Sequence, residues 1–263
     1  MLTQIKHFLP EAHLWQNQII WYDVTDSTNN QAKALIKQGV PHGTVLIADR
    51  QTAGRGRMGR SFVSPAGMGV YMSVILRLHT PADQLMQLTC AAAVAACDAV
   101  EKAAGLRPGI KWTNDLVFGG RKLAGILTEL VITPTETAAI IGIGINCCQT
   151  EADFPEEIQS FAGSLSMACG KSVGRAQVAA TLIESFSQMA ENLGNKKEIL
   201  NAYRRDCITV DKQISIVKAD EIRHGKAIGI DDSGALLVEF SDKHIEAVNA
   251  GEVSVRGMYG YCP

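Results

Sequence analysis

The order of apolar and polar residues along the chain predicts several buried strands. Runs rich in β-branched residues and leucine at 44–48 and 69–78 are typical of strands that are covered on both faces. Runs at 109–132 and 137–148 have the same texture, and Gly119–Gly120 marks a turn inside the first of them. We therefore expect successive antiparallel strands joined by tight turns in this part of the chain.

Helical periodicity appears between and after these strands. Following the strand-like "WYDVT", apolar residues recur at helical spacing, and Asp26 or Ser27 stands where a helix cap is needed. An alanine-rich helix is expected to begin after a capping box at 80–83 and to end before Gly105. Two further helices are expected at 175–193 and 196–206.

The sequence pattern changes from helical periodicity to short β-like runs near residue 208. Beyond it, short β-like runs are separated by turn residues, among them the segment 231–234 with the sequence "DDSG". Many short strands with frequent turns are typical of a small β-barrel. The sequence therefore predicts a larger first domain at 1–208 and a small β-domain at 209–263.

The composition is that of a globular chain with a sizeable core. Its 263 residues are 46% hydrophobic and 20% charged, and the net charge of −2 does not favour nucleic acid or an anionic membrane as a partner. The sequence has no secretory signal and no apolar run of membrane-spanning length. The seven cysteines include no C-x-x-C pair, which argues against a zinc site and a disulfide framework. We expect a cytoplasmic protein.

The segment "AGRGRMGRSF" at 53–62 is the clearest candidate for chemistry. Its glycines have the G-x-G-x-x-G spacing of a dinucleotide-binding turn, but Arg55, Arg57 and Arg60 are interleaved with them. A dinucleotide turn opens directly into a helix, whereas Pro65 follows here within a few residues. The acidic residue expected about 20 positions later is also missing. The glycine spacing alone is therefore a weak signal.

A flexible loop that carries guanidinium groups fits this segment better. Guanidinium groups hold carboxylates and phosphates bidentately. Two unit charges ~4 Å apart repel by about 1 kcal/mol in water and by about 4 kcal/mol at an effective dielectric of 20, so a pocket that brings two anions together needs positive charge. The loop predicts such a pocket, and a solvated basic loop is the plain alternative.

Two motifs around a turn add a possible ion pair. Lys122 of "RKLAGIL" and Asp115 of "KWTNDL" lie on opposite sides of the glycine turn, so a hairpin would bring them face to face. Gly125 would allow a ligand or another backbone to approach closely. Asn146, at the end of "GIGIN", has an amide able to pair with adenine. The plain alternative for Lys122 and Asp115 is a surface ion pair, which would contribute little. The plain alternative for Asn146 is an ordinary turn residue.

Six motifs together resemble one family. "DSTN", "QTAGRGRMGR", "KWTNDL", "RKLAGIL", "GIGIN" and "GEVSVR" occur in the order and at about the spacing found in the biotin protein ligases, over residues 21–256. The arginine loop together with "KWTND…RKLAGIL" is specific to that family, which usually has proline at the position of Thr113. Only residues 1–20 precede the first motif, so the resemblance is to the monofunctional type without a DNA-binding domain, and no binding to DNA is expected.

The resemblance implies an α+β fold. The catalytic domain, 1–208, would have a mixed and largely antiparallel central sheet flanked by helices, as in biotinyl and lipoyl ligases. The domain at 209–263 would be a small SH3-like β-barrel. Exposed strands of the central sheet would allow a homodimer.

The resemblance also implies a reaction. An ATP-dependent ligase would activate biotin as biotinyl-5′-AMP and transfer it to a lysine of a biotin carboxyl carrier protein, such as the carrier domain of acetyl-CoA carboxylase. Mg²⁺ would be held by phosphates and water, so no protein metal site is expected.

Residue roles follow from the same resemblance. Lys122 would lie between the biotin carboxylate and the α-phosphate, and Tyr71 and Trp112 would line the pocket. The implied catalytic residues are Lys122, Arg55 and Asp115. The implied biotin contacts are Ser27, Thr28, Asn29, Gln51, Gly54, Arg55, Gly56, Arg57, Lys122 and Gly125. The implied nucleotide contacts are Arg57, Arg60, Trp112, Asn114, Lys122, Asn146 and Arg256.

Two other functions stay open at the level of sequence. A lipoate ligase or octanoyl transferase would share the fold and use a lysine near the acyl carboxylate, but these relatives lack "GRGRMGR". A non-catalytic module could bind anions or nucleic acid through the arginine loop, although the acidic net charge weighs against nucleic acid.

Overall fold

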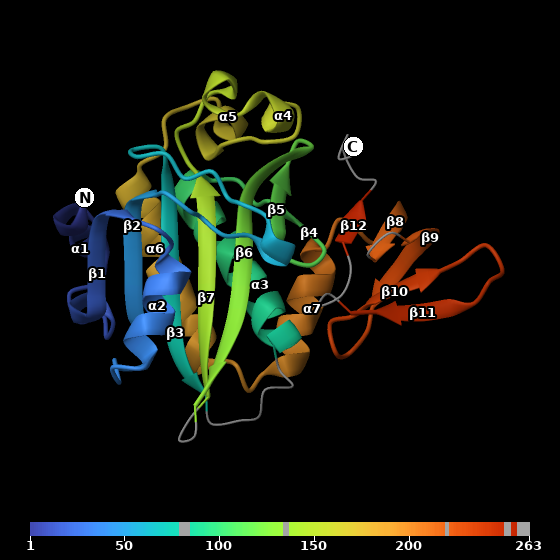
Figure 1. Ribbon diagram of the computed structural model, residues 1–263, viewed down its shortest axis with the longest axis horizontal. Helices are drawn as coiled ribbons and strands as arrows, with labels where there is room; N and C mark the ends of the chain where they lie inside the picture. The colour runs from blue at the N-terminus through green and yellow to red at the C-terminus, as the bar shows by residue number, and fades with distance from the viewer. Residues whose placement is uncertain (79–84, 134–136, 219–220, 250–253, 257–263) are drawn as a thin grey trace.

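A computed structural model describes the chain except for residues 79–84, 134–136, 219–220, 250–253 and 257–263. The described residues form two β-sheets with helices packed against the larger one (Figure 1). The smaller sheet lies at the C-terminal end of the chain, beside the helix α7 (Lys196–Asp206). The predicted α+β fold is confirmed.

The larger sheet is mixed and mainly antiparallel. β1 pairs with β2 in parallel, and every other neighbouring pair is antiparallel. This arrangement places the long strands β3, β7 and β6 at the centre. In spatial order the strands are β1 (Ile19–Thr25), β2 (Thr44–Gln51), β3 (Gly69–Leu78), β7 (Thr137–Asn146), β6 (Arg121–Ile132), β5 (Asp115–Phe118) and β4 (Gly109–Lys111).

Helices cover both faces of the central sheet. In Figure 1, α2 (Thr28–Ile36) lies in front of the sheet, and α3 (Leu85–Ala104) and α6 (Arg175–Glu191) lie behind it. The alanines of α3 are largely buried, and their small side chains let this helix approach its neighbours closely. The shorter helices are α1 (Leu2–Phe8), η1 (Gln16–Gln18), η2 (Arg57–Gly59), η4 (Glu151–Asp153), α4 (Glu156–Gln159) and α5 (Leu165–Cys169).

Strand β3 supplies both hydrophobic layers because its side chains alternate between the two faces of the sheet. Met72 and Val74 belong to the large core that includes α3 and α6, whereas Ile75 packs with Ala32 of α2 on the other side. Ser73 shares the α2 face with Ile75 and is completely buried. A polar residue at that position brings hydrogen-bonding groups to the N-terminus of α2.

The smaller sheet has five antiparallel strands. Its order is β11 (Ile245–Val248), β10 (Leu236–Glu239), β9 (Glu221–Ile230), β8 (Gln213–Lys218) and β12 (Ser254–Arg256). It is fixed to the rest of the chain by side-chain contacts: Arg204 of α7 donates from Nε to the carbonyl of Ile230, 2.9 Å away. A domain boundary at residue 208 remains a prediction, which the change of sheet between α7 and β8 supports.

The helices and strands agree closely with the sequence patterns. The run at 69–78 is a single strand, the glycine turn at 119–120 joins β5 to β6, and α6 and α7 occupy the two segments expected to be helical. The predicted capping box at 80–83 lies outside the described residues. Among the described residues, no helix has the length and apolar character needed to cross a membrane.

An arginine joins three segments on the helical side of the fold. Arg107 forms two hydrogen bonds with Asp206 at the end of α7, at 2.5 and 3.2 Å, and further ion pairs with Asp98 and Glu101 of α3. The Asp206 side chain is only 6% exposed. Burial raises the pKa of Asp206, but hydrogen bonds from Arg205 and Arg107 outweigh that effect, and the net shift is downward.

Replacing Asp206 with Asn is expected to lower the free energy of unfolding by about 2 kcal/mol, because it weakens a largely buried charged pair. The folded-state pKa lies below the ordinary value of 3.8. The stabilisation is therefore complete above that value and is lost as the pH falls through the lowered pKa. Urea denaturation across the acid range measures both the size and the pH dependence of the effect.

The matched control is Asp232→Asn. Asp232 pairs with Arg204 at 2.7 Å, but its side chain is 97% exposed, so the expected loss is below about 0.5 kcal/mol. Equal losses in the two variants would contradict the role given to Asp206.

Candidate active site

A cavity of about 650 Å³ lies between the N-terminus of α2, strands β5 to β7, and the arginine loop, which we define as residues 53–62. Its lining is mixed. Phe62, Ile126 and Phe161 contribute apolar surface, while Ser27 and Lys122 contribute polar and charged groups. A half-enclosed pocket with apolar walls and a few convergent polar groups is typical of a small-molecule site.

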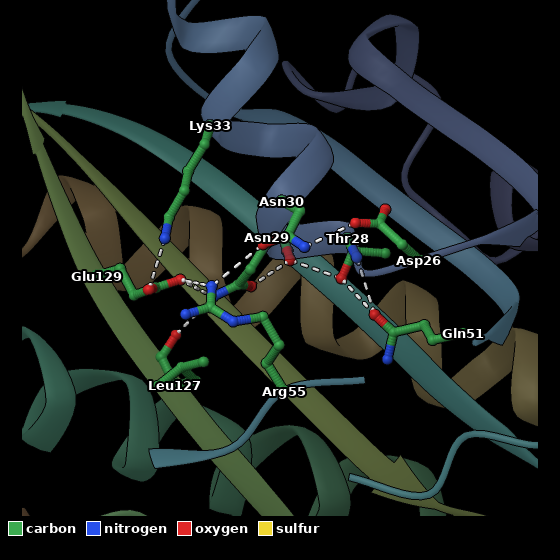
Figure 2. Close-up of polar contacts among 10 residues, drawn as sticks. Asp26, Thr28, Asn29, Asn30, Lys33, Gln51, Arg55, Leu127 and Glu129 are labelled. Atoms are coloured by element: carbon green, nitrogen blue, oxygen red, sulfur yellow. Dashed lines mark hydrogen bonds and ion pairs between the residues drawn. The ribbon is translucent and has the colours of Figure 1, made fainter. Parts of the chain in front are cut away.

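The start of α2 presents a group of polar side chains to this pocket (Figure 2). The helix begins after Ser27, whose side chain forms no capping hydrogen bond. Gln51 at the end of β2 takes over this role, since its Oε1 accepts from the backbone N–H of Thr28 at 2.8 Å. Gln51 Nε2 in turn donates to Ser64 Oγ at 2.9 Å. The first turn of α2 is thus fixed by the strand beside it.

Asn29 lies against β7 because residue 142 is glycine. A Cβ atom at Gly142 would come within 2.1 Å of Asn29 Oδ1. Asn29 Nδ2 donates to the Leu127 carbonyl at 3.3 Å and to Glu129 Oε2 at 2.9 Å, and Oδ1 accepts from Ser73 Oγ at 2.6 Å. The side chain therefore has a fixed orientation at the floor of the pocket.

The arginine loop is a folded turn between β2 and β3. The Phe62 N–H donates to the Gly54 carbonyl at 2.9 Å, and the Gly56 N–H donates to the Arg60 carbonyl at 2.7 Å. A single turn of 3₁₀ helix, η2, lies within it, and no helix follows the third glycine. The arrangement lacks the helix that a dinucleotide-binding turn requires.

Two arginines of the loop extend to different parts of the pocket. Arg55 Nη1 lies 2.9 Å from Glu129 Oε2 and 3.3 Å from Asn30 Oδ1, next to α2. Arg57 Nη1 donates to Asn114 Oδ1 at 3.0 Å, in the turn between β4 and β5. The loop is thereby attached on both sides of the pocket.

Lys122 and Asp115 form an ion pair with Nζ and Oδ1 2.7 Å apart. The predicted juxtaposition of these residues is confirmed. Asp115 pairs with Gly125 across the two strands, but Val117 pairs with Lys122, so the register shifts between them. This bulge brings the Lys122 side chain to the same side as Asp115, and a Cβ at Gly125 would lie 3.2 Å from Lys122 Nζ.

Positive charge is in excess in the lining of the cavity. Arg55, Arg57, Arg60, Lys111 and Lys122 contribute cations, whereas Asp115 and Glu157 contribute carboxylates. Burial lowers the pKa of the Arg57 guanidinium, and the charge of Asp115 opposes this shift. A partly buried site with surplus cations is suited to anionic ligands.

The turn that carries Asn114 is held by distant segments. The Trp112 N–H donates to Thr209 Oγ1 at 2.8 Å, and the Trp112 indole N–H donates to the Gly234 carbonyl at 3.1 Å. The Tyr203 hydroxyl donates to the Thr113 carbonyl at 2.9 Å. The peptide bond between Trp112 and Thr113 is cis. One wall of the pocket is therefore attached to both α7 and the C-terminal sheet.

The segment 151–163 forms a second wall that the sequence motifs did not indicate. It lies beside Lys122, whose N–H donates to the Phe161 carbonyl at 2.7 Å and whose carbonyl accepts from the Gly163 N–H at 2.9 Å. Arg121 holds the same segment through the carbonyls of Gln159 and Ala162. The only sequence signal is a set of apolar residues within an acidic stretch, and it does not reveal the contact with Lys122.

Asn146 lies at the junction of this wall with β7. Its Nδ2 donates to the Gly163 carbonyl at 2.9 Å, and its Oδ1 accepts from Gln149 Nε2 at 3.2 Å. Bidentate pairing with adenine would require both of these internal contacts to be exchanged for the ligand.

Most of the residues implied by the resemblance line one cavity. Gly54 does not contribute to the lining; a Cβ there would come within 2.3 Å of the Phe62 carbonyl, so this glycine serves the fold of the loop. Tyr71 is fully buried and donates to the Pro65 carbonyl at 3.0 Å, outside the lining. The side chain of Arg256 lies outside the described residues. The remaining implied residues are Ser27, Thr28, Asn29, Gln51, Arg55, Gly56, Arg57, Arg60, Trp112, Asn114, Asp115, Lys122, Gly125 and Asn146.

Comparison with known proteins assigns the family. Residues 21–146 match the biotin/lipoate A/B protein ligase family, and residues 209–256 match the C-terminal domain of biotin protein ligases. The chain is 39% identical to the bifunctional ligase/repressor BirA of Bacillus subtilis over 230 residues, covering 85% of this chain and 70% of the relative.

The chain belongs to the biotin protein ligase family.

Other members agree with this assignment. The biotin–[acetyl-CoA-carboxylase] ligase of Mycobacterium tuberculosis is 32% identical over 87% of this chain and 85% of its own length. The solved biotin protein ligase from Aquifex aeolicus in complex with biotin and ATP has a TM-score of 0.78 at 30% identity and covers 90% of this chain and 98% of that one. The fold expected of the family is thus present over nearly the whole chain.

Replacing Gly142 with Ala is expected to displace the Asn29 side chain from its position in the cavity. The added methyl group would overlap Asn29 Oδ1, and Asn29 cannot move without losing hydrogen bonds to Ser73 and Glu129. The expected loss in the free energy of unfolding is about 1–3 kcal/mol, measured by thermal denaturation. Gly229→Ala is the control, because a Cβ there makes only an ordinary 3.8 Å contact.

Proposed function

We propose that the protein is an ATP-dependent biotin protein ligase that forms biotinyl-5′-AMP and then transfers biotin to a lysine of a biotin carboxyl carrier protein. The observation that carries this proposal is the Lys122–Asp115 pair, which lies in one cavity with the surplus cations and with the polar N-terminus of α2. Family membership supports the same reaction.

The two ends of the cavity suit different parts of the substrates. The end at α2 offers Thr28, Gln51 and the fixed amide of Asn29 to a ring with N–H and C=O groups, beside the apolar ring of Phe62. The ureido ring of biotin has these groups. The other end offers Lys122 and Arg57, which suit the carboxylate of biotin and the phosphates of ATP.

The first step is an attack by a biotin carboxylate oxygen on the α-phosphorus of ATP. A new P–O bond forms, the bond to the bridging oxygen breaks, and pyrophosphate leaves with its electron pair. The substrate carboxylate is itself the nucleophile, so the protein mainly aligns the two anions and offsets their charge. Lys122 Nζ leaves Asp115 and binds an oxygen of each substrate.

The second step needs a proton acceptor. The carrier lysine attacks the carbonyl carbon of the adenylate as a neutral amine, an amide forms, and AMP leaves. Asp115 becomes available once Lys122 has turned to the substrate oxygens, and its carboxylate accepts the proton from the attacking nitrogen.

Mg²⁺ would offset charge on the triphosphate. Among the described residues, no group of three or more His, Cys, Asp or Glu side chains is placed to hold a metal ion. The donor set of the cavity therefore fits an ion bound mainly by phosphate oxygens and water. A carboxylase carrier domain as acceptor, a homodimer and a cytoplasmic location remain predictions for this chain.

Replacing Lys122 with Met is expected to reduce biotin-dependent ATP–pyrophosphate exchange by at least about 10²-fold, because one cation bridges both reacting anions. The side chain is only 24% exposed, and methionine keeps much of its volume. The exchange rate at saturating biotin and ATP measures the effect.

Lys102→Met is the matched control. Lys102 forms an ion pair with Glu184 at 2.6 Å on the helical side of the fold, away from the cavity. It is expected to keep the full exchange rate. Exchange with lipoate or octanoate in place of biotin, or full exchange by the Lys122 variant, would refute the proposed function.

A further inference from the structure

Glu129 on β6 is the point at which three separate elements meet (Figure 2). Its Oε2 accepts from Arg55 Nη1 of the arginine loop and from Asn29 Nδ2 of α2, each at 2.9 Å. Its Oε1 accepts from Lys33 Nζ, one turn further along α2, at 2.8 Å. Glu129 does not belong to the lining of the cavity, so it acts on any ligand through these partners.

The carboxylate is charged and largely enclosed. Its side chain is 18% exposed, whereas the side chains of Arg55 and Lys33 are 36% and 37% exposed. Burial raises the pKa of Glu129, but hydrogen bonds from Lys33, Asn29 and Arg55 outweigh it, so the net shift is downward. One exposed ion pair contributes little; three donors on one enclosed carboxylate form a network that holds its members in place.

The charge of Glu129 also determines which way the neighbouring hydrogen bonds run. A carboxylate only accepts, so the NH₂ group of Asn29 must face it, and Asn29 Oδ1 must accept from Ser73. Ser73 Oγ also lies 2.7 Å from Thr28 Oγ1. The single hydroxyl proton of Ser73 is already donated to Asn29 Oδ1. Thr28 must then donate to Ser73.

The direction of these hydrogen bonds affects Gln51, which lines the cavity. Thr28 Oγ1 lies 3.2 Å from Gln51 Oε1 and only 2.7 Å from Ser73 Oγ, so we infer that its one proton goes to Ser73. With that proton direction, Gln51 Oε1 accepts from the Thr28 backbone N–H at 2.8 Å and keeps its second lone pair for an N–H group of a ligand. The chain of hydrogen bonds from Glu129 to Gln51 thus prepares the acceptor that a ureido N–H needs.

We propose that Glu129 is a positioning residue that couples closure of the arginine loop to recognition of the ureido ring of biotin. The inference rests on the proposed function. Through Arg55 the carboxylate holds the loop over the α2 end of the cavity, and through Asn29 it orients the groups that bind the ring. Arg57, attached to Asn114, lines the other end of the cavity, which the proposed function assigns to the reacting oxygens.

The test replaces Glu129 with Met and with Gln, and measures KM for biotin and for ATP in the exchange assay. Methionine removes the charged acceptor that Arg55 and Asn29 share and leaves each with one longer contact at 3.3 Å, so the KM for biotin is expected to rise at least about tenfold. Glutamine keeps one acceptor oxygen for both donors but loses the charge, so about a threefold rise is expected. The KM for ATP is expected to stay within about twofold, since Glu129 does not reach the other end of the cavity.

Two controls separate this role from a general loss of structure. Lys33→Met removes the partner of the other carboxylate oxygen and leaves Arg55 and Asn29 bound. Glu184→Met removes a carboxylate of similar exposure, 24%, that pairs with Lys102 on the helical side. Both are expected to keep the biotin KM within about twofold of the parent protein. Thermal unfolding of each variant defines the temperature at which all of them are folded.

Trypsin gives a readout that does not depend on catalysis, because the loop contains its own cleavage sites at Arg55, Arg57 and Arg60. In saturating biotin, cleavage of the loop is expected to be several-fold faster in Glu129→Met than in the parent or in Lys33→Met, since loop cleavage follows the open population. If Glu129→Met does not fold, Glu129→Gln is compared with the parent in both assays.

Equal increases in the KM values for biotin and ATP would overturn the proposal, and so would an unchanged KM for biotin with unchanged loop cleavage. A parent protein without biotin-dependent exchange would refute the proposed function and this inference together. A parent that exchanges normally, with Glu129 variants that behave like it, would overturn this inference alone.

Discussion

The ion pair between Lys122 and Asp115 is the contact around which the pocket is arranged. It depends on a bulge between β5 and β6, without which the lysine would face the opposite side of the sheet from Asp115 and Gly125. The backbone of Lys122 also pairs with the segment 151–163. Lys122 therefore connects the carboxylate of Asp115 with one wall of the pocket.

The arginines of the arginine loop bind different partners. Its glycines allow it to fold back on itself, and its arginines then diverge, Arg55 towards Glu129 and Arg57 towards Asn114. The two contacts lie on opposite sides of the cavity, so the loop spans the space between them. In the proposed reaction, a loop attached on both sides would limit the access of water to the adenylate.

The pocket is not a property of the central sheet alone. Trp112 is bound to Thr209 and Gly234, and the Tyr203 hydroxyl is bound to Thr113, so the turn that presents Asn114 is supported by α7 and by the C-terminal sheet. Loss of that sheet would leave the indole N–H without its acceptor and the turn without a fixed position. The small C-terminal sheet thus supports the site through the turn that precedes β5, and the predicted nucleotide contact of Arg256 stays a prediction.

The sequence alone predicted the main strands and helices from hydrophobic periodicity, because periodicity is a local property of the chain. Its short motifs gave the family, and through that resemblance the α+β class and many of the polar and charged residues that line the pocket. The pairing of Lys122 with Asp115 was also predictable, since a short hairpin separates them. Only the tertiary structure revealed the contacts between residues that lie far apart in the sequence. Glu129 meets Asn29 and Arg55 across three elements, the segment 151–163 pairs with Lys122, and Tyr71 turns away from the pocket to bind Pro65. Such contacts follow from strand register and from the packing of whole elements, which no local pattern of residues encodes.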